Sequence, residues 1–219
     1  MNNLQLIIFD LDGTLIDSEA IYRKGWSHVL KAYGHDLHES EFEVMRGKST
    51  HHNNEFIKSY LGSDELVQEA RQQREAYYFN ALEQGDIQLK AGALELIAQA
   101  KAQGLKLAVA TSSYKERGIA SLQALDLLKY FDHLAFGDEV TFSKPDPEIY
   151  QRILDEATVN AAQAIAIEDS ASGMQAALAA GIASFLVPES EVDLAEMVGE
   201  FTVHEDLHEV RKYVFAEVE

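Results

Sequence analysis

Two carboxylates follow an apolar run near the start of this 219-residue chain. Residues 6–9, LIIF, lead directly into Asp10, and Asp12 and Gly13 follow closely. A short continuous apolar run is typical of a strand buried on both faces of a parallel sheet. Two carboxylates at the end of such a strand repel each other, and a hard divalent cation such as Mg²⁺ would relieve that repulsion. The alternative interpretation is an ordinary Asp/Gly turn after a strand.

Three further segments carry polar side chains at predicted strand ends or in the loops that follow. They are Thr111 and Ser112 at the end of the run 105–113, Lys144 in the segment 143–147, and Glu168 and Asp169 after the run 164–167. The carboxyl ends of parallel strands meet at one edge of a sheet, so we expect these groups to converge there with the first pair. Together they supply a nucleophile, a cation, hydrogen-bond donors and an acid/base, which phosphoryl transfer requires.

Each of these groups also has an ordinary structural interpretation. Thr111 and Ser112 are common helix-capping residue types. Lys144 precedes a proline and is typical of a solvated turn. Glu168 and Asp169 would suit the positive end of a helix. Taken together, these interpretations do not explain why every strand end carries a group that is suited to one task.

Hydrophobic periodicity predicts two kinds of structure along the chain. Residues 17–85 contain helical patterns and no convincing strand, whereas helices alternate with strands from Gly92 onward. Such alternation is typical of a parallel sheet with helices on both faces. We therefore predict an α/β protein with a Rossmann-like core of residues 1–16 and 86–219, and an inserted α-helical cap domain of residues 17–85. The two connections, near residues 16 and 86, would act as hinges.

The composition excludes several classes of function. A formal net charge of −19 argues against nucleic acid or an anionic membrane surface as a partner. The absence of cysteine excludes disulfides, zinc–thiolate sites and a thiol nucleophile. No stretch approaches the roughly 20 apolar residues of a membrane span, and the N-terminus lacks a signal-peptide pattern. We expect a cytoplasmic protein, and a monomer is the default expectation.

The order of the motifs resembles that of the haloacid dehalogenase-like hydrolases, a family of mostly Mg²⁺-dependent phosphohydrolases. The most specific part is the string of residues 10–14, DLDGT, and the remaining motifs follow in the family's order over the whole chain. The resemblance implies that Asp10 is a nucleophile that forms an aspartyl-phosphate. It implies that Asp12 is the general acid and then the general base.

The resemblance also implies roles for the other strand-end residues. Thr111 and the amide of Ser112 would hold the phosphate, and Lys144 would balance charge between nucleophile and phosphate. The metal ligands would be Asp10, the backbone carbonyl of Asp12, and Glu168 and Asp169, with Glu168 acting directly or through water.

The helical insert resembles the small α-helical cap of the β-phosphoglucomutase/phosphatase-like branch, which excludes water and chooses the substrate. Mutases of that branch typically carry a histidine twelve residues after the nucleophile, where this chain has Tyr22. They also carry an arginine in a cap loop, where this chain has Thr50; a later cap base is represented by Arg74 on an uncertain alignment. These departures favour hydrolysis. Two cations of the same loop, Arg46 and Lys48, are candidates for binding the leaving group, and the alternative is a solvated basic loop.

The sequence thus predicts a Mg²⁺-dependent phosphatase that acts on small phosphate monoesters, with sugar phosphates as the favoured class. The alternative enzyme is a β-phosphoglucomutase-like phosphosugar mutase, which would yield an isomeric sugar phosphate instead of free phosphate. An alternative from another class is a non-catalytic sensor of a phosphorylated ligand, in which the acids would be expected to have decayed; both members of each pair are intact.

Overall fold

A computed structural model describes residues 3–45, 50–188, 192–195 and 197–216 of the chain. The chain forms two compact units, one of residues 1–17 and 88–219 and the other of residues 18–87.

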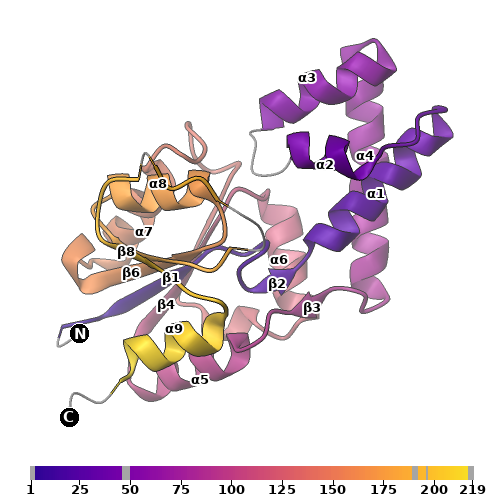
Figure 1. Cartoon of the computed structure of the whole chain (residues 1–219). Coiled ribbons are helices and arrows are strands. Elements are labelled where there is room, and N and C mark those ends of the chain that lie inside the picture. Colours follow the sequence, from indigo (N-terminus) through magenta and orange to yellow (C-terminus); the bar gives the residue numbers. More distant parts are fainter. Residues whose placement is uncertain (1–2, 46–49, 189–191, 196, 217–219) are drawn as a thin grey trace. The chain divides into compact units, whose positions relative to one another are not determined.

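The first unit is built on a six-stranded sheet with the strand order β5-β4-β1-β6-β7-β8, in which every neighbouring pair is parallel (Figure 1). The α/β prediction with a parallel, Rossmann-like sheet is confirmed. The strands are β1 (Leu6–Phe9), β4 (Lys106–Thr111), β5 (His133–Phe136), β6 (Ala164–Glu168), β7 (Ala183–Leu186) and β8 (Phe201–Val203). Strand β1 pairs with both β4 and β6, so the residue that follows it emerges between the ends of two neighbouring strands.

Helices cover both faces of this sheet. Helices α7 and α8 lie on one face, and α5 and α9 pack together on the other (Figure 1). The helices of this unit are α5 (Ala93–Ala102), α6 (Lys115–Ala124), α7 (Glu148–Ala157), α8 (Ala171–Ala179) and α9 (Leu207–Val214), with two short 3₁₀ helices at Leu128–Tyr130 and Ala161–Gln163.

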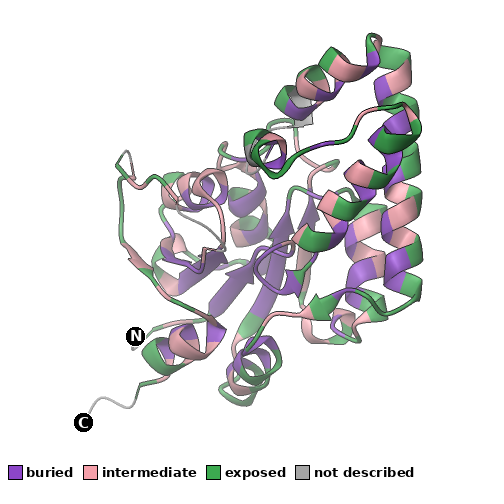
Figure 2. Cartoon of the chain, turned by 45° about the vertical axis from the view of Figure 1, so that its right-hand side comes forward, coloured by how far each residue is buried: buried purple, intermediate pink, exposed green. Residues whose placement is uncertain are grey.

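The strand side chains form the core of the first unit. All four residues of β1 are fully buried, and Figure 2 shows the central strands as the most buried part of the unit. Leu6 and Ile8 belong to one cluster with Ile149 and Ile153 of α7, as the two-residue period of a strand requires. Burying an aliphatic side chain of this size stabilises a fold by about 1.5–3 kcal/mol. Strand β1 is therefore a firm support for the acidic residues that follow it.

Three short strands are not predicted by the hydrophobic pattern. Strands β2 (Ile16–Asp17) and β3 (Gln88–Leu89) pair in an antiparallel manner where the chain leaves and re-enters the first unit. Strand β8 extends the sheet beyond β7. Segments of two or three residues are too short to show alternation, so only their tertiary pairing identifies them.

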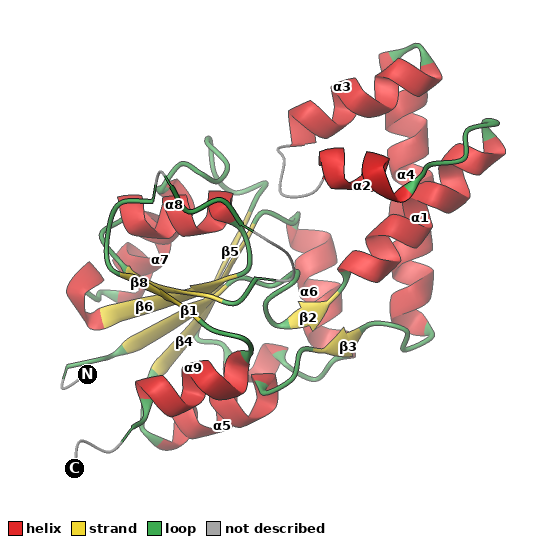
Figure 3. Cartoon of the chain, in the orientation of Figure 1, coloured by secondary structure: helices red, strands yellow, loops and turns green. Residues whose placement is uncertain are grey.

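The second unit consists of helices and loops, with no strand among its described residues (Figure 3). Its long helices α1 and α4 pack against each other. A buried cluster around Trp26, Leu30 and Ile57 forms its core. The helices are α1 (Glu19–Ala32), α2 (Glu39–Met45), α3 (Thr50–Leu61) and α4 (Asp64–Glu83). Across the part of the chain that is described, every helix is too short or too polar to cross a membrane.

Candidate active site

Asp10 directly follows β1 and lies at the carboxyl edge of the parallel sheet. Its backbone N–H donates to the carbonyl oxygen of Ile167 at 2.9 Å, which continues the β1–β6 ladder by one residue. The residue is 7% exposed. Burial raises the pKa of its carboxyl group to about 7; the charge of Lys144 opposes this rise, and the charge of Glu168 adds to it.

The ammonium group of Lys144 joins two carboxylates and a strand end. Its Nζ lies 2.7 Å from Oδ1 of Asp10, 2.5 Å from Oε1 of Glu168 and 2.9 Å from the carbonyl oxygen of Ala110 at the end of β4. A lysine ammonium has three N–H donors, so these contacts use all of them. Burial opposes the charge of Lys144, but the nearby carboxylates of Asp10 and Glu168 outweigh it and raise its pKa. Lys144 is therefore a fixed positive charge inside the site.

Glu168, the last residue of β6, is fully buried. Its Oε1 also accepts a hydrogen bond from the hydroxyl of Tyr150 on α7. Within the described part of the chain, its Oε2 has no hydrogen-bond partner. A Cβ built on Gly173 would lie 2.0 Å from Oε2, so only glycine lets the first turn of α8 approach this carboxylate so closely. Glu168 thus offers one buried oxygen that is available to a ligand.

Three carboxylates converge at this edge. Asp10, Glu168 and Asp169 each contribute an oxygen, and these oxygens lie within 4.8 Å of one another. Gly13 has a φ of +85°, and a Cβ on it would lie 2.2 Å from Oδ2 of Asp169. The glycine after the two acids therefore provides both the turn and the space for the third carboxylate. Such a group of carboxylate oxygens is suited to a hard divalent cation.

Asp12 has a different set of partners from the three clustered carboxylates described above. Its Oδ2 accepts hydrogen bonds from Oγ of Ser113 at 2.5 Å and from Nη2 of Arg117 at 3.0 Å. Arg117 also donates to Oγ of Ser113, so the three side chains contact one another. The Asp12 side chain is 26% exposed, which leaves it accessible to a small molecule.

The hydroxyl residues after β4 lie close to this group. Thr111 is buried, and its Oγ1 accepts the backbone N–H of Ser113 at 3.0 Å, which leaves the hydroxyl proton of Thr111 for another acceptor. Ser112 is exposed. A Cβ on Gly137 would lie 2.2 Å from the Ser112 carbonyl oxygen, so glycine allows the loop after β5 to touch the loop after β4.

The helix-cap interpretations of the strand-end residues are wrong. Helix α6 begins at Lys115 with Tyr114 as its N-cap residue, so neither Thr111 nor Ser112 caps it. Helix α8 is capped by Ser170, whose Oγ accepts the N–H of Gly173 at 3.2 Å. The N-cap residue of α8 is therefore Ser170 and not Glu168 or Asp169.

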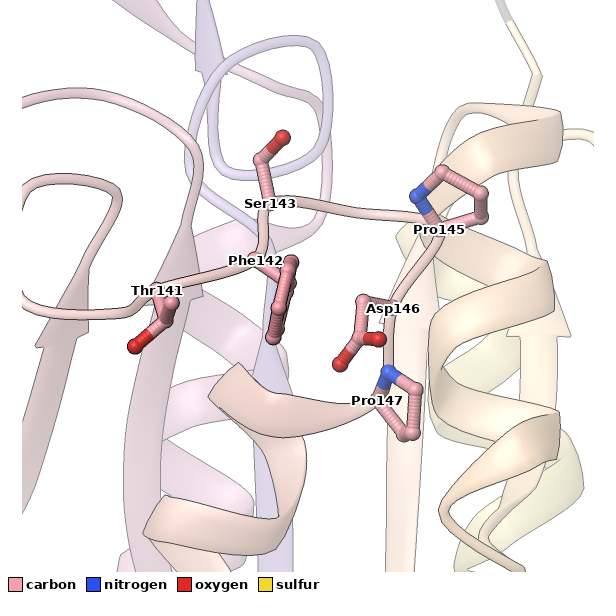
Figure 4. Close-up of a pocket in the computed structure, with 6 residues that line it drawn as sticks. All are labelled: Thr141, Phe142, Ser143, Pro145, Asp146 and Pro147. Carbon is pink, nitrogen blue, oxygen red and sulfur yellow. The ribbon is translucent and has the colours of Figure 1, made fainter.

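The loop that carries Lys144 is held by the first residue of α7. The carboxylate of Glu148 accepts the backbone N–H groups of Thr141 and Phe142, each at 2.8 Å. The N–H of Glu148 in turn donates to Oδ1 of Asp146 at 3.0 Å. Figure 4 shows the open pocket that this loop forms, which is lined by Thr141, Phe142, Ser143, Pro145, Asp146 and Pro147. These hydrogen bonds hold the exposed loop in a fixed conformation, which places the buried side chain of Lys144 beside Asp10.

The residues of the helical unit that the sequence analysis singled out are Tyr22, Arg46, Lys48 and Arg74. Arg46 and Lys48 lie outside the described residues. Tyr22, which stands where the mutases carry a histidine, packs against the guanidinium of Arg74, with 4.8 Å between Cζ and the ring centre. Arg74 is 3% exposed and forms an ion pair with Glu75 at 2.5 Å. Tyr22 and Arg74 therefore form a cation–π pair inside the helical unit.

Three site residues are missed by the sequence reasoning: Ser113, Arg117 and Tyr150. Ser113 belongs to the same polar run as Thr111, and Arg117 lies four residues later, in α6. That spacing is a usable signal for both. Tyr150 lies on the apolar face of an amphipathic helix. A tyrosine at such a position is expected to be an ordinary core residue, so the sequence pattern does not predict that it contacts the site.

Comparisons with known proteins agree with this architecture. Residues 7–187 match the family model described as haloacid dehalogenase-like hydrolase. The chain is 32% identical to the phosphorylated carbohydrates phosphatase of Thermotoga maritima over 82% of each protein. It is also 32% identical to the validoxylamine A 7'-phosphate phosphatase of Streptomyces hygroscopicus subsp. limoneus, over 94% of this chain and 96% of that protein.

A solved structure has the same fold. It is a mutant of CbbY from Rhodobacter sphaeroides in complex with xylulose-1,5-bisphosphate, at 28% identity and a TM-score of 0.80, over 94% of this chain and 96% of that chain. The family match covers residues 7–187, and the two relatives cover 82% and 94% of this chain. The chain therefore belongs to the haloacid dehalogenase-like hydrolases.

Proposed function

We propose that this protein is a Mg²⁺-dependent phosphatase that hydrolyses small phosphate monoesters, with sugar phosphates as its substrates, through an aspartyl-phosphate on Asp10. The observation that carries the proposal is the arrangement around Asp10. Its carboxylate is held at 2.7 Å by a buried lysine and lies beside two further carboxylates at the carboxyl edge of the sheet. Open α/β sheets bind their ligands at this edge.

The residues at this edge fit Mg²⁺. Asp10, Glu168 and Asp169 offer hard oxygen ligands within 4.8 Å of one another, and Oε2 of Glu168 is buried without a hydrogen-bond partner in the described structure. On the family's pattern, the backbone carbonyl of Asp12 would be a further ligand. When bound, the ion supplies positive charge that offsets the phosphate oxygens and the carboxylates.

In the first step, the Asp10 carboxylate attacks the phosphorus atom and an oxygen–phosphorus bond forms. The bond between phosphorus and the leaving oxygen breaks, and Asp12 gives that oxygen a proton. Lys144 keeps Asp10 oriented and offsets negative charge as the phosphate approaches. The hydroxyl of Thr111 and the amide of Ser112 are the donors for the phosphoryl oxygens.

In the second step, a water molecule attacks the phosphorus atom of the aspartyl-phosphate. Asp12, now a carboxylate, accepts a proton from that water, and the bond between Asp10 and phosphorus breaks. Inorganic phosphate leaves, and both aspartates return to their starting states. The different environments of the two acids support this division of roles. Asp10 is buried beside Lys144, whereas Asp12 is partly exposed and accepts hydrogen bonds from Ser113 and Arg117.

The substrate class is supported by the relatives. The Thermotoga and Streptomyces proteins are named as phosphatases of phosphorylated carbohydrates and of validoxylamine A 7'-phosphate, and the CbbY mutant was solved with a sugar bisphosphate. Each of these names gives a phosphorylated compound, and two of them give a phosphorylated sugar. We infer the same class for this chain, with the helical unit of residues 18–87 acting as the cap that selects among such substrates.

The test is phosphate release from a panel of phosphorylated sugars and nucleotides, with Mg²⁺ and with a chelator. We expect metal-dependent release that is concentrated on a few sugar phosphates. Asp10→Asn should abolish turnover while its circular dichroism spectrum and Mg²⁺-free melting remain those of a folded protein. Appearance of an isomeric sugar phosphate without free phosphate would replace the phosphatase by a mutase, and retained turnover in Asp10→Asn would refute the role of Asp10.

A further inference from the structure

The candidate site contains a second, partly buried cation, which the proposed reaction steps do not use. Arg117 Nη2 lies 3.0 Å from Oδ2 of Asp12, and the Arg117 side chain is 17% exposed. Lys144 forms ion pairs with Asp10 and Glu168, whereas Arg117 forms an ion pair with Asp12. The two cations of the site therefore contact different carboxylates.

The two donors to Asp12 come from one short segment. Ser113 lies at the end of the β4 loop, and Arg117 lies four residues later in the first turns of α6. Arg117 also donates to the Ser113 hydroxyl, so each donor holds the other in place. Both bind the same oxygen of Asp12, Oδ2, which fixes the rotation of the carboxylate and hence the direction of its other oxygen.

The backbone turn that carries Asp12 does not by itself orient the carboxyl group. Asp12 stands in the turn after β1, where Gly13 N–H donates to the carbonyl oxygen of Ile16 at 2.9 Å. This turn sets the Cα–Cβ direction but leaves the side-chain torsions open. A general acid works only when its proton lies within hydrogen-bond reach of the leaving oxygen, and small misplacements of a reacting group are costly.

We propose that Arg117 is a positioning residue that, together with Ser113, orients the carboxyl group of Asp12 toward the leaving-group oxygen. This inference rests on the proposed function, because it needs Asp12 to act as the general acid. Arg117 then controls proton delivery to the leaving group, and it does not contact the phosphorus atom or the nucleophile. Two competing roles predict different results: direct binding of the substrate, and support of the fold alone.

The experiment measures kcat/KM for a series of aryl phosphates of similar size whose leaving phenols differ in acidity. This constant covers steps up to leaving-group departure, so it does not depend on hydrolysis of the aspartyl-phosphate. We expect Arg117→Ala to lose about 10- to 100-fold on the least acidic phenol and less than about 3-fold on 4-nitrophenyl phosphate, since general acid catalysis contributes roughly 10²–10⁴-fold where a proton is needed. Arg117→Lys should recover part of the loss.

Two further variants complete the design. Asp12→Asn should show the same steep dependence on leaving-group acidity, and Asp12→Asn/Arg117→Ala should lose no more than Asp12→Asn, because the two residues act as one unit. Arg152→Ala is the matched control. Arg152 is an arginine on α7 whose side chain is 35% exposed and pairs with Glu156 at 2.8 Å, and its replacement should leave the series unchanged.

An equal loss on every aryl phosphate would overturn the proposal, because binding or folding defects act on all members alike. Additive losses in the double variant would overturn it as well. Failure of the proposed function is a separate result: the wild-type protein would then release no phosphate from any member of the series.

Discussion

Replacing Lys144 by methionine should destabilise the metal-free protein strongly. Methionine keeps an unbranched apolar side chain but removes the ammonium, which lies 2.7 Å from Asp10 and 2.5 Å from Glu168. Two buried carboxylates would then face each other without a counter-charge. Removing one partner of a buried ion pair costs about 3–5 kcal/mol. For a chain of this size, that corresponds to a fall in Tm of roughly 6–20 °C.

The destabilisation should depend on pH through Asp10. Burial raises the pKa of this carboxyl to about 7, and loss of Lys144 removes the charge that opposes the rise. Below about pH 6, Asp10 is largely protonated and needs no counter-charge, so Lys144 contributes less to stability. Near pH 8, Asp10 is ionised in the wild-type protein, so the stabilisation from Lys144 is present there and lost in the variant. The difference in Tm should therefore grow from about pH 6 to about pH 8.

Thermal unfolding followed by circular dichroism in the presence of a chelator measures this difference. Lys101→Met is the matched control, because Lys101 pairs with Asp132 at 3.0 Å while both side chains are more than a third exposed. An exposed pair contributes about 0–1 kcal/mol, so the control should shift Tm by a few degrees at most. If Lys144→Met melts like the control, or if its deficit is the same at both pH values, the description of a buried charge network around Asp10 is wrong.

Two other substitutions test the proposed metal site and the proposed cap. Gly173→Ala would place a Cβ 2.0 Å from Oε2 of Glu168, so we expect a loss of about 1–3 kcal/mol in stability and weaker Mg²⁺ binding; an unchanged melt and calorimetric titration would contradict this. Lys48→Ala, a prediction from the sequence alone, should change the ranking of sugar phosphates more than it changes hydrolysis of a featureless aryl phosphate. Equal losses on all substrates would show that Lys48 does not select among them.

Much of the fold can be predicted from the sequence, because burial in the core requires a local pattern of apolar residues. The apolar runs of β1, β4 and β6 are buried on both faces and bordered by polar residues, which is the pattern expected of central parallel strands. The helices of both units show apolar residues at helical spacing. Strands β2, β3 and β8 leave no such pattern, because their identity depends on a partner strand that is distant in sequence.

The candidate site can be predicted only in part, because the sequence gives the residue types at the strand ends but not the contacts among them. The acids, hydroxyls and lysine could be predicted because each stands at the end of a strand or in the loop beyond it, and parallel strands end at one edge. The geometry among them could not. Tyr150 reaches Glu168 from a helix, and its position in an apolar stripe looks like any buried aromatic residue.

By itself, the sequence determined which chemical groups this protein brings to the edge of its sheet and which family it resembles. Those properties depend on residue types and on strand order, which local patterns record. The family resemblance implied that Lys144 stands near Asp10. The tertiary structure alone showed that Lys144 also contacts Glu168 and that Arg117 lies against Asp12. These contacts join residues that are 24, 105 and 134 positions apart, and no spacing along the chain predicts which cation contacts which carboxylate. Pairing is a matter of distance and burial in three dimensions, since side-chain charges interact through space.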